Sequence, residues 1–345
     1  MAPLNPNLDH QSRPSRSDAR SAADYVTGIL DGNRVTLSQA ITLLESTRPD
    51  HRDTARTVVE ECLPHSGDSI RVAVTGVPGV GKSTFIEALG QRLVAAGRHL
   101  AVLTVDPSSE RSKGSILGDK TRMGTLASEE DAFIRPSPTA GTLGGVAPRT
   151  REAILLCEAA GYDTVFVETV GVGQSEISVR SMVDFFLLLA LAGAGDELQG
   201  IKRGIVEVAD AIAITKADGD NRAPAKAARA EYEKALRLLS DPDSGWEPPV
   251  LTCSSQTGAG IDEVWGAVER YRAYTQETGF FEEQRRRQAQ HWMEQAIEQR
   301  LHEEFFSDPD VQAARGDVEE ALQDGRLSSL AAAERLLSIY RDSTS

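Results

Sequence analysis

Cysteine and histidine are scarce in this chain, and it has no long apolar run. The three cysteines, Cys62, Cys157 and Cys253, are far apart and odd in number, which argues against a disulfide framework and against a zinc knuckle. The longest apolar run starts at Phe185 and is too short for a transmembrane helix, which needs about 20 residues. We therefore expect a soluble, cytoplasmic protein with reduced thiols.

Positive charge is also in deficit. The chain of 345 residues has 37 basic and 52 acidic side chains, a formal net charge of −15. This balance argues against nucleic acids and anionic membranes as main partners, because phosphate contact requires basic surface. Residues 1–20 are polar and rich in proline and serine, without the apolar core of a secretory signal. We expect them to form a disordered tail.

The rest of the chain divides into three parts by its periodicity. Residues 21–66 have helical spacing, with Thr36 as the expected N-cap of one helix and a second helix from about Asp53 to Cys62. Residues 67–276 alternate strand-like and helix-like segments, with strands expected near 71, 99, 163, 184, 210 and 248. Several of these strands are apolar on both faces, which predicts an α/β fold with a mainly parallel sheet flanked by helices.

Residues 277–345 are strongly helical and charged. One face has apolar side chains at three-and-four spacing: Trp292, Met293, Ala296, Ile297, Leu301 and Phe305. Two explanations remain open for this face. It packs on its own domain, or it forms a homodimer interface.

The most informative stretch is "VAVTGVPGVGKSTFIEALG", which begins at Val72. The pattern Gly76-x-x-x-x-Gly81-Lys82-Ser83 follows a strand and opens a helix, as a phosphate-binding loop requires. Glycines let backbone N–H groups approach phosphate oxygens, Lys82 would reach the β- and γ-phosphates, and Ser83 would bind Mg²⁺. The predicted P-loop comprises Gly76, Val77, Pro78, Gly79, Val80, Gly81, Lys82, Ser83 and Thr84. The sequence predicts a P-loop NTPase that binds a nucleoside triphosphate.

Two further strand ends predict that the base is guanine. "TKAD" places Thr215, Lys216 and Asp218 after a strand, where the carboxylate of Asp218 can accept both N1–H and N2–H₂ of guanine. Paired contacts of this kind discriminate between bases by ~1–3 kcal/mol. Lys216 would cover the purine face. Backbone amides of the segment Ser254, Ser255 and Gln256 would meet the guanine carbonyl oxygen.

Acidic residues between these motifs predict the metal site. Asp106 and Glu168 each follow a strand, and Asp119 lies in a glycine-rich loop; with Ser83 they are the candidate Mg²⁺ ligands. Gly171 would sense the γ-phosphate through its N–H. The nearest candidate for orienting water is Gln174, beyond the simplest spacing, so we expect slow intrinsic turnover that a partner accelerates.

Together these motifs resemble the MeaB family, also labelled ArgK. The similarity rests on "GVPGVGKSTFIEALG", "VDPSS", "GSILGDKTRM", "FIRPSPTAGTLGGVA", "ETVGVGQSE" and "GAGDELQGIKRG" and extends from about Asp24 to Arg272. Two departures stand out. Thr215 replaces the family's usual asparagine, which predicts loss or change of one hydrogen bond to the base or the phosphate loop. "SERSKGS" replaces a more glycine-rich loop.

This resemblance implies a GTPase of the deviant G-protein class, which includes nickel-delivery and signal-recognition GTPases. The family's members are chaperones of adenosylcobalamin-dependent methylmalonyl-CoA mutase that gate cofactor entry and protect the mutase. It implies a homodimer formed through the helical C-terminal arm, with GTP or GDP and Mg²⁺ bound. Residues of a mobile segment would couple nucleotide state to the partner, namely Asp196, Glu197, Gln199 and Lys202.

Three other classes of protein are alternatives to a GTPase chaperone. A metal-delivery GTPase of the same fold would need clustered cysteine or histidine, and the six histidines and three cysteines are scattered. A P-loop kinase or ATPase would need an acceptor site, and no such constellation is evident. A non-catalytic scaffold has no need of Lys82, Ser83 and Glu168 together. Related acyl-CoA mutases remain alternatives as the partner.

Overall fold

The computed structural model describes residues 20–46, 48–105, 123–137, 146–169, 175–193, 203–238 and 242–343. The expected tail thus lies almost wholly outside the described residues. The chain divides into two compact units, Met1–Thr278 and Gly279–Ser345. Among the helices of the described part, none combines the length and apolar character that crossing a membrane requires.

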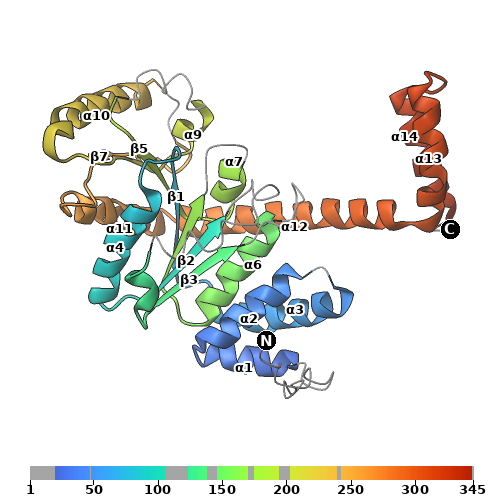
Figure 1. The fold of residues 1–345 in the computed structure, drawn as a ribbon, viewed down its shortest axis with the longest axis horizontal. Coiled ribbons are helices and arrows are strands. Elements are labelled where there is room, and N and C mark those ends of the chain that lie inside the picture. The colour runs from blue at the N-terminus through green and yellow to red at the C-terminus, as the bar shows by residue number, and fades with distance from the viewer. Residues whose placement is uncertain are drawn as a thin grey trace, which may run out of the picture. The chain divides into compact units, whose positions relative to one another are not determined.

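A seven-stranded sheet in the order β3-β2-β4-β1-β5-β6-β7 forms the centre of the first unit (Figure 1). Its strands are β1 (Ile70–Thr75), β2 (Leu100–Val105), β3 (Ala132–Ser137), β4 (Thr164–Thr169), β5 (Phe185–Ala190), β6 (Ala211–Ile214) and β7 (Val250–Thr252). All neighbouring strands are parallel. Every residue of β1, β2, β4, β5 and β6 is buried, which explains their continuous apolar character. The predicted α/β fold is confirmed.

Strand β3 was not predicted from the sequence. It lies at one edge of the sheet and pairs with β2. Arg135 and Pro136 interrupt its apolar pattern, and proline lacks the N–H of a central strand. An edge position tolerates proline because one side of the strand needs no ladder partner. This segment has only a weak apolar pattern of its own, and it forms a strand because it pairs with β2.

Helices cover the sheet in two groups. In the first unit they are α4 (Lys82–Ala95), α6 (Val146–Ala159), α7 (Ser175–Arg180), α9 (Arg203–Glu207), α10 (Arg222–Leu236) and α11 (Ile261–Glu277), with short 3₁₀ turns at Leu63–His65, Leu126–Ser128 and Gly219–Asn221. Helix α4 packs against α11, whereas α6 packs against the N-terminal helices. Figure 1 shows these two groups on opposite sides of the strands. Such crossover helices are what parallel strands require.

The N-terminal helices α1 (Ala22–Leu30), α2 (Arg34–Glu45) and α3 (Pro49–Cys62) contact α6. The prediction that Thr36 is an N-cap is wrong. Asn33 is the N-cap of α2, and its Oδ1 accepts a hydrogen bond from the Thr36 backbone N at 3.0 Å, so Thr36 lies inside the first turn. Helix α3 starts four residues before the expected Asp53, at Pro49, because proline suits a first helical turn.

Charged side chains are buried where β1, β5 and β6 begin. Arg71 Nε lies 2.7 Å from Glu158 Oε1, and the two side chains are 10% and 1% exposed. Nearby, Arg180 Nη1 lies 3.1 Å from Asp210 Oδ2. Asp210 Oδ2 also accepts a hydrogen bond from the Phe186 backbone N at 2.8 Å. These charges are therefore compensated within the fold, as buried charges must be.

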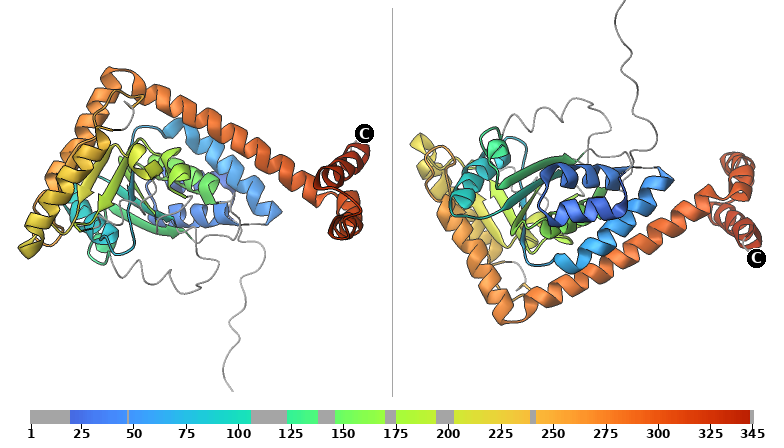
Figure 2. Two further views of the ribbon diagram at one scale, coloured as in Figure 1. Left: turned by 90° about the horizontal axis from the view of Figure 1, so that it is seen from above. Right: turned by 90° about the horizontal axis from the view of Figure 1, so that it is seen from below.

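The second unit contains α12 (Phe280–Ser307), α13 (Pro309–Gln323) and α14 (Ser329–Ser343). Helices α13 and α14 lie side by side (Figure 2). Phe305 and Tyr340 meet edge-on with ring centroids 5.3 Å apart, and Asp308 caps α13. On α12, Met293, Ile297 and Leu301 are 57%, 51% and 56% exposed.

Candidate nucleotide site

The phosphate loop runs from the end of β1 to the start of α4. Gly76 has a φ of +148°, and a Cβ atom there would collide with the carbonyl group of Leu189 on the neighbouring strand. Gly81 has a φ of +100° and is the N-cap of α4. Both positions require glycine, because other residues rarely adopt such backbone angles. The predicted strand–loop–helix arrangement is therefore present.

Lys82 is folded back into this loop. Its Nζ donates to the carbonyl oxygen of Gly76 at 2.7 Å and reaches that of Val77 at 3.4 Å. The residue is only 9% exposed. The ammonium group therefore lies against the backbone of the loop, where an anionic ligand would bind.

Ser83 and Glu168 meet at the start of α4. Ser83 Oγ donates to Glu168 Oε1 at 2.8 Å, across 85 residues of sequence. Glu168 is 3% exposed and lies on β4, where it pairs with Val74 of β1. A hydroxyl and a carboxylate oxygen side by side are ligands that suit Mg²⁺.

Several predicted residues lie outside the part of the chain that the structure describes. Outside the described residues lie the candidate metal ligands Asp106 and Asp119 and the candidate γ-phosphate sensor Gly171. The same holds for Gln174 and for the predicted coupling residues Asp196, Glu197, Gln199 and Lys202. Their roles stay predictions. Within the described residues, no group of three or more His, Cys, Asp and Glu side chains is arranged to hold a metal ion.

A cavity of about 340 Å³ adjoins the phosphate loop. It is lined by Val80, Gly81, Thr84, Thr215, Lys216, Asp218, Asn221, Ser255 and Gln256. The loop after β6 and the loop after β7 supply most of these side chains, so three segments that are distant in sequence converge on one space. Parallel strands cause this convergence, because their carboxyl ends lie along one edge of the sheet.

Thr215 and Lys216 bind the phosphate loop directly. Thr215 Oγ1 donates to the carbonyl oxygen of Val80 at 2.8 Å, and Lys216 Nζ donates to that of Gly79 at 2.8 Å. Lys216 has a φ of 55°, which is uncommon for a residue with a side chain. Although threonine replaces the family's usual asparagine at position 215, its side chain donates a hydrogen bond to the phosphate loop.

Asp218 is held from the neighbouring loop. The hydroxyl group of Ser254 donates a short hydrogen bond to Asp218 Oδ2, and Ser254 is fully buried. Ser254 therefore contacts the carboxylate, whereas Ser255 and Gln256 line the cavity itself. Sequence reasoning missed Asn221, which lines the cavity and donates from Nδ2 to the carbonyl oxygen of Lys216 at 2.8 Å. Its place three residues after Asp218 was the available signal.

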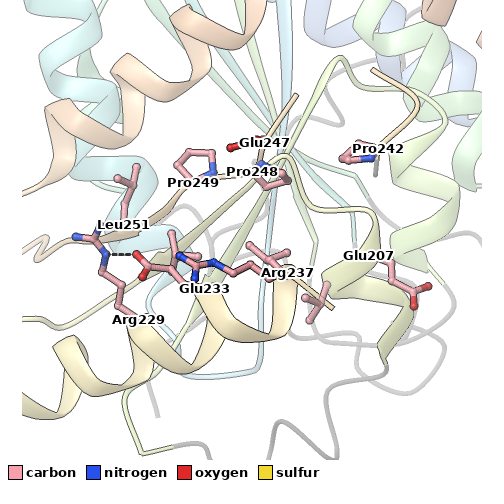
Figure 3. Close-up of a pocket in the computed structure, with 12 residues that line it drawn as sticks. Glu207, Arg229, Glu233, Arg237, Pro242, Glu247, Pro248, Pro249 and Leu251 are labelled. Carbon is pink, nitrogen blue, oxygen red and sulfur yellow. Dashed lines mark hydrogen bonds and ion pairs between the residues drawn. The ribbon is translucent and has the colours of Figure 1, made fainter. Parts of the chain in front are cut away.

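The cavity beside the phosphate loop is not the larger of the two cavities described here. A larger cavity of about 550 Å³ is lined by residues of α9, α10 and β7 and by the segment before β7 (Figure 3). Arg229 and Glu233 form an ion pair at 2.8 Å on its wall. This cavity contains none of the predicted site residues. The phosphate loop, rather than cavity volume, identifies the candidate site.

A family model described as "Methylmalonyl Co-A mutase-associated GTPase MeaB" matches residues 37–310. The chain belongs to the MeaB family. This membership confirms the resemblance inferred from the motifs. It also confirms the predicted activity class, GTP hydrolysis, and with it the binding of a guanine nucleotide.

Relatives of this MeaB-family chain carry the same class of name. A probable GTPase of Mycobacterium tuberculosis is 50% identical over 313 residues, which cover 91% of this chain and 93% of that protein. GTPase ArgK of Escherichia coli is 48% identical over 288 residues, covering 84% and 87%. The mitochondrial methylmalonic aciduria type A homolog of Mus musculus is 43% identical over 343 residues, covering 96% and 83%.

A solved structure supports the same fold. The crystal structure of an LAO/AO transport system kinase superposes with a TM-score of 0.73 at 39% sequence identity. The match covers 93% of this chain and 97% of that one. The MeaB-family fold is therefore observed over nearly the whole length.

Proposed function

We propose that this GTPase is a chaperone of an adenosylcobalamin-dependent acyl-CoA mutase, with methylmalonyl-CoA mutase as the partner. It would gate cofactor loading and protect or reactivate the mutase. The observation that carries the proposal is the meeting of Lys82, Ser83 and Glu168 around the phosphate loop of a MeaB-family chain. The family description itself names the mutase.

The proposed reaction is in-line attack of water on the γ-phosphorus atom of GTP. Lys82 would leave its carbonyl partners for β- and γ-phosphate oxygens and neutralise their charge. Backbone N–H groups of the loop between Gly76 and Gly81 would orient the phosphates, aided by the positive end of α4. Positioning and charge neutralisation supply the catalysis, since phosphoryl transfer needs little covalent help.

Magnesium fits the oxygen pair at the start of α4. Ser83 and Glu168 would hold the ion through their hydroxyl and carboxylate oxygens. Bound there, Mg²⁺ neutralises charge on the phosphate oxygens. Asp106 and Asp119 are proposed to complete its surroundings.

The base would occupy the 340 Å³ cavity beside the phosphate loop. Asp218 would accept N1–H and N2–H₂ of guanine, and the Ser254 hydroxyl group keeps its carboxylate in place. Lys216 would cover the purine face with its aliphatic stem while its ammonium group remains on the loop. These contacts support GTP over ATP.

We further propose a homodimer formed through α12. Met293, Ile297 and Leu301 recur at four-residue spacing and are all more than half exposed, as the apolar stripe of a helix–helix interface would be in a single chain. Analytical ultracentrifugation of the full chain tests this. A dimer that Ile297→Glu converts to a monomer is expected, and an intrinsic monomer would contradict it.

The deciding experiment measures GTP and ATP hydrolysis with and without methylmalonyl-CoA mutase, using Lys82→Ala as control. GTP-selective turnover that rises with the mutase and disappears in the control is expected. If the mutase leaves GTP turnover unchanged, the partner is wrong. Preference for ATP would overturn the role of Asp218 and favour a kinase.

A further inference from the structure

Arg92 connects two parts of the nucleotide site from outside the cavity. It lies in the last turn of α4, the helix whose first two residues are Lys82 and Ser83. Its Nη2 donates to the carbonyl oxygen of Gly258 at 3.0 Å, across 166 residues of sequence. Its Nη1 lies 2.7 Å from Asp262 Oδ1. One side chain therefore joins α4 to the loop between β7 and α11.

That loop is closed by its own hydrogen bonds. The Gly258 backbone N donates to the carbonyl oxygen of Ser254 at 2.8 Å, and the Ser254 backbone N donates to that of Ala259 at 2.8 Å. Ser254 in turn donates from its hydroxyl group to the carboxylate of Asp218. A continuous series of hydrogen bonds thus runs from Arg92 through Gly258 and Ser254 to Asp218.

Stability of the helix end does not explain this arrangement. A cation near the carboxyl end of a helix interacts favourably with the helix dipole without needing a specific partner in a distant loop. The partner Asp262 is 78% exposed, and exposed ion pairs contribute little. The contact with Gly258 is different, because a Cβ atom at this residue would collide with Arg92 Nη2. The loop therefore lies close against the guanidinium group.

We propose that Arg92 is a positioning residue for guanine recognition. By fixing residues 254–259 to α4, it sets the distance between the groups that bind the phosphates and Asp218, which contacts the base. The nucleotide then meets both sets of groups in register without having to order the loop. This inference rests on the proposal that Asp218 reads guanine.

The test compares Arg92→Met with the wild type, because methionine keeps an apolar stem and removes both hydrogen bonds. Dissociation constants are measured for GDP and for inosine diphosphate, which lacks the 2-amino group. In Arg92→Met, the Kd for GDP should rise about 3- to 10-fold, the cost of ordering a loop on binding. The Kd for inosine diphosphate should rise less, so that preference for guanine narrows. The kcat at saturating GTP should be unchanged while KM rises.

Arg98→Met is the matched control. Arg98 Nη2 also reaches α11, donating to Glu269 Oε1 at 3.1 Å, and its Nη1 lies 3.7 Å from Asp163 Oδ1. It makes no contact with residues 254–259 among the contacts of the described residues. The preference of Arg98→Met for GDP over inosine diphosphate should equal that of the wild type.

Equal weakening of GDP and inosine diphosphate in Arg92→Met would reduce Arg92 to a structural residue and overturn the inference. An unchanged Kd for GDP would do the same. If the wild type itself binds GDP and inosine diphosphate equally, the failure lies with Asp218, and the inference falls with that assignment.

Discussion

The two ends of the parallel sheet use charged side chains in opposite ways. Where β1, β5 and β6 begin, the guanidinium groups of Arg71 and Arg180 face the carboxylates of Glu158 and Asp210. Where β1 and β6 end, Lys82 and two residues after β6 instead donate to backbone carbonyl groups of the phosphate loop. The first end is closed by ion pairs, and the second adjoins a cavity.

This difference separates stability from binding. A buried ion pair has no spare charge for a ligand, and loss of one partner leaves the other uncompensated. A cation that donates to backbone carbonyl groups can exchange those bonds for phosphate oxygens. The amino ends of the strands should therefore govern unfolding, and the carboxyl ends should govern nucleotide turnover.

Lys82→Ala should have the largest effect on turnover. It removes the ammonium group that donates to the Gly76 carbonyl oxygen of the phosphate loop, so kcat for GTP should fall at least 100-fold, as loss of a preorganised charge does. The free energy of unfolding should fall by only about 1.5–3 kcal/mol, the worth of a hydrogen bond to a charged group. Phosphate release and urea unfolding measure the two quantities. Turnover that survives would mean that the carboxyl end is not catalytic.

Glu158→Ala should have the largest effect on stability. It leaves Arg71 buried without its carboxylate, which costs about 3–5 kcal/mol. Urea unfolding measures the loss, and turnover per folded molecule should stay at the wild-type level. Glu233→Ala is the control, because its pair with Arg229 is 38% and 47% exposed and should be worth under about 1 kcal/mol. If Glu158→Ala and Glu233→Ala lower the free energy of unfolding by similar amounts, the buried ion pairs at the amino ends of the strands do not govern stability.

Asp218→Asn should change the preference for guanine and should affect the stability of the fold less than Glu158→Ala does. An amide can accept only one of the two guanine donors, so kcat/KM for GTP should fall by the equivalent of ~1–3 kcal/mol. Xanthosine triphosphate carries an acceptor in place of the 2-amino group and should become a better substrate than before. Competition kinetics with both nucleotides measure the exchange. An unchanged GTP preference would remove Asp218 from the base site.

The smallest expected difference between the two ends of the sheet is in the reactivity of two buried cysteine thiols. Cys157 precedes Glu158 at the closed end, and Cys253 precedes Ser254 at the open end. Burial raises the pKa of both thiols, that of Cys253 to about 12. Both should react slowly at pH 8, and faster as rising pH increases the thiolate fraction.

Cys253 should nevertheless react a few-fold faster than Cys157, and GDP should slow Cys253 alone. The reason is that opening of a ligand site requires less free energy than opening of a packed core. Alkylation followed by mass spectrometry gives both rates in one sample. Protection of both thiols to the same extent by GDP would show that the two ends open together.

Much of the fold was accessible from sequence because its signals are local. The glycine pattern from Gly76 to Gly81 identified the phosphate loop, since its geometry arises within a few residues. Continuous apolar runs in the sequence predicted the buried strands. Strand β3 and the N-cap Asn33 were missed for the complementary reason: the first depends on pairing with β2, and the second on a choice between neighbouring capping residues.

What the sequence determined by itself is the chemistry of each segment: a loop for phosphates, a carboxylate suited to guanine, and acids for a metal ion. Only the tertiary structure decided which of them meet. Ser83 reaches Glu168 across 85 residues, Thr215 reaches Val80 across 135, and Arg92 reaches Gly258 across 166. Such contacts have no local signal, because they arise when parallel strands place their ends along one edge and the packing of α4 against α11 brings distant loops within hydrogen-bonding distance.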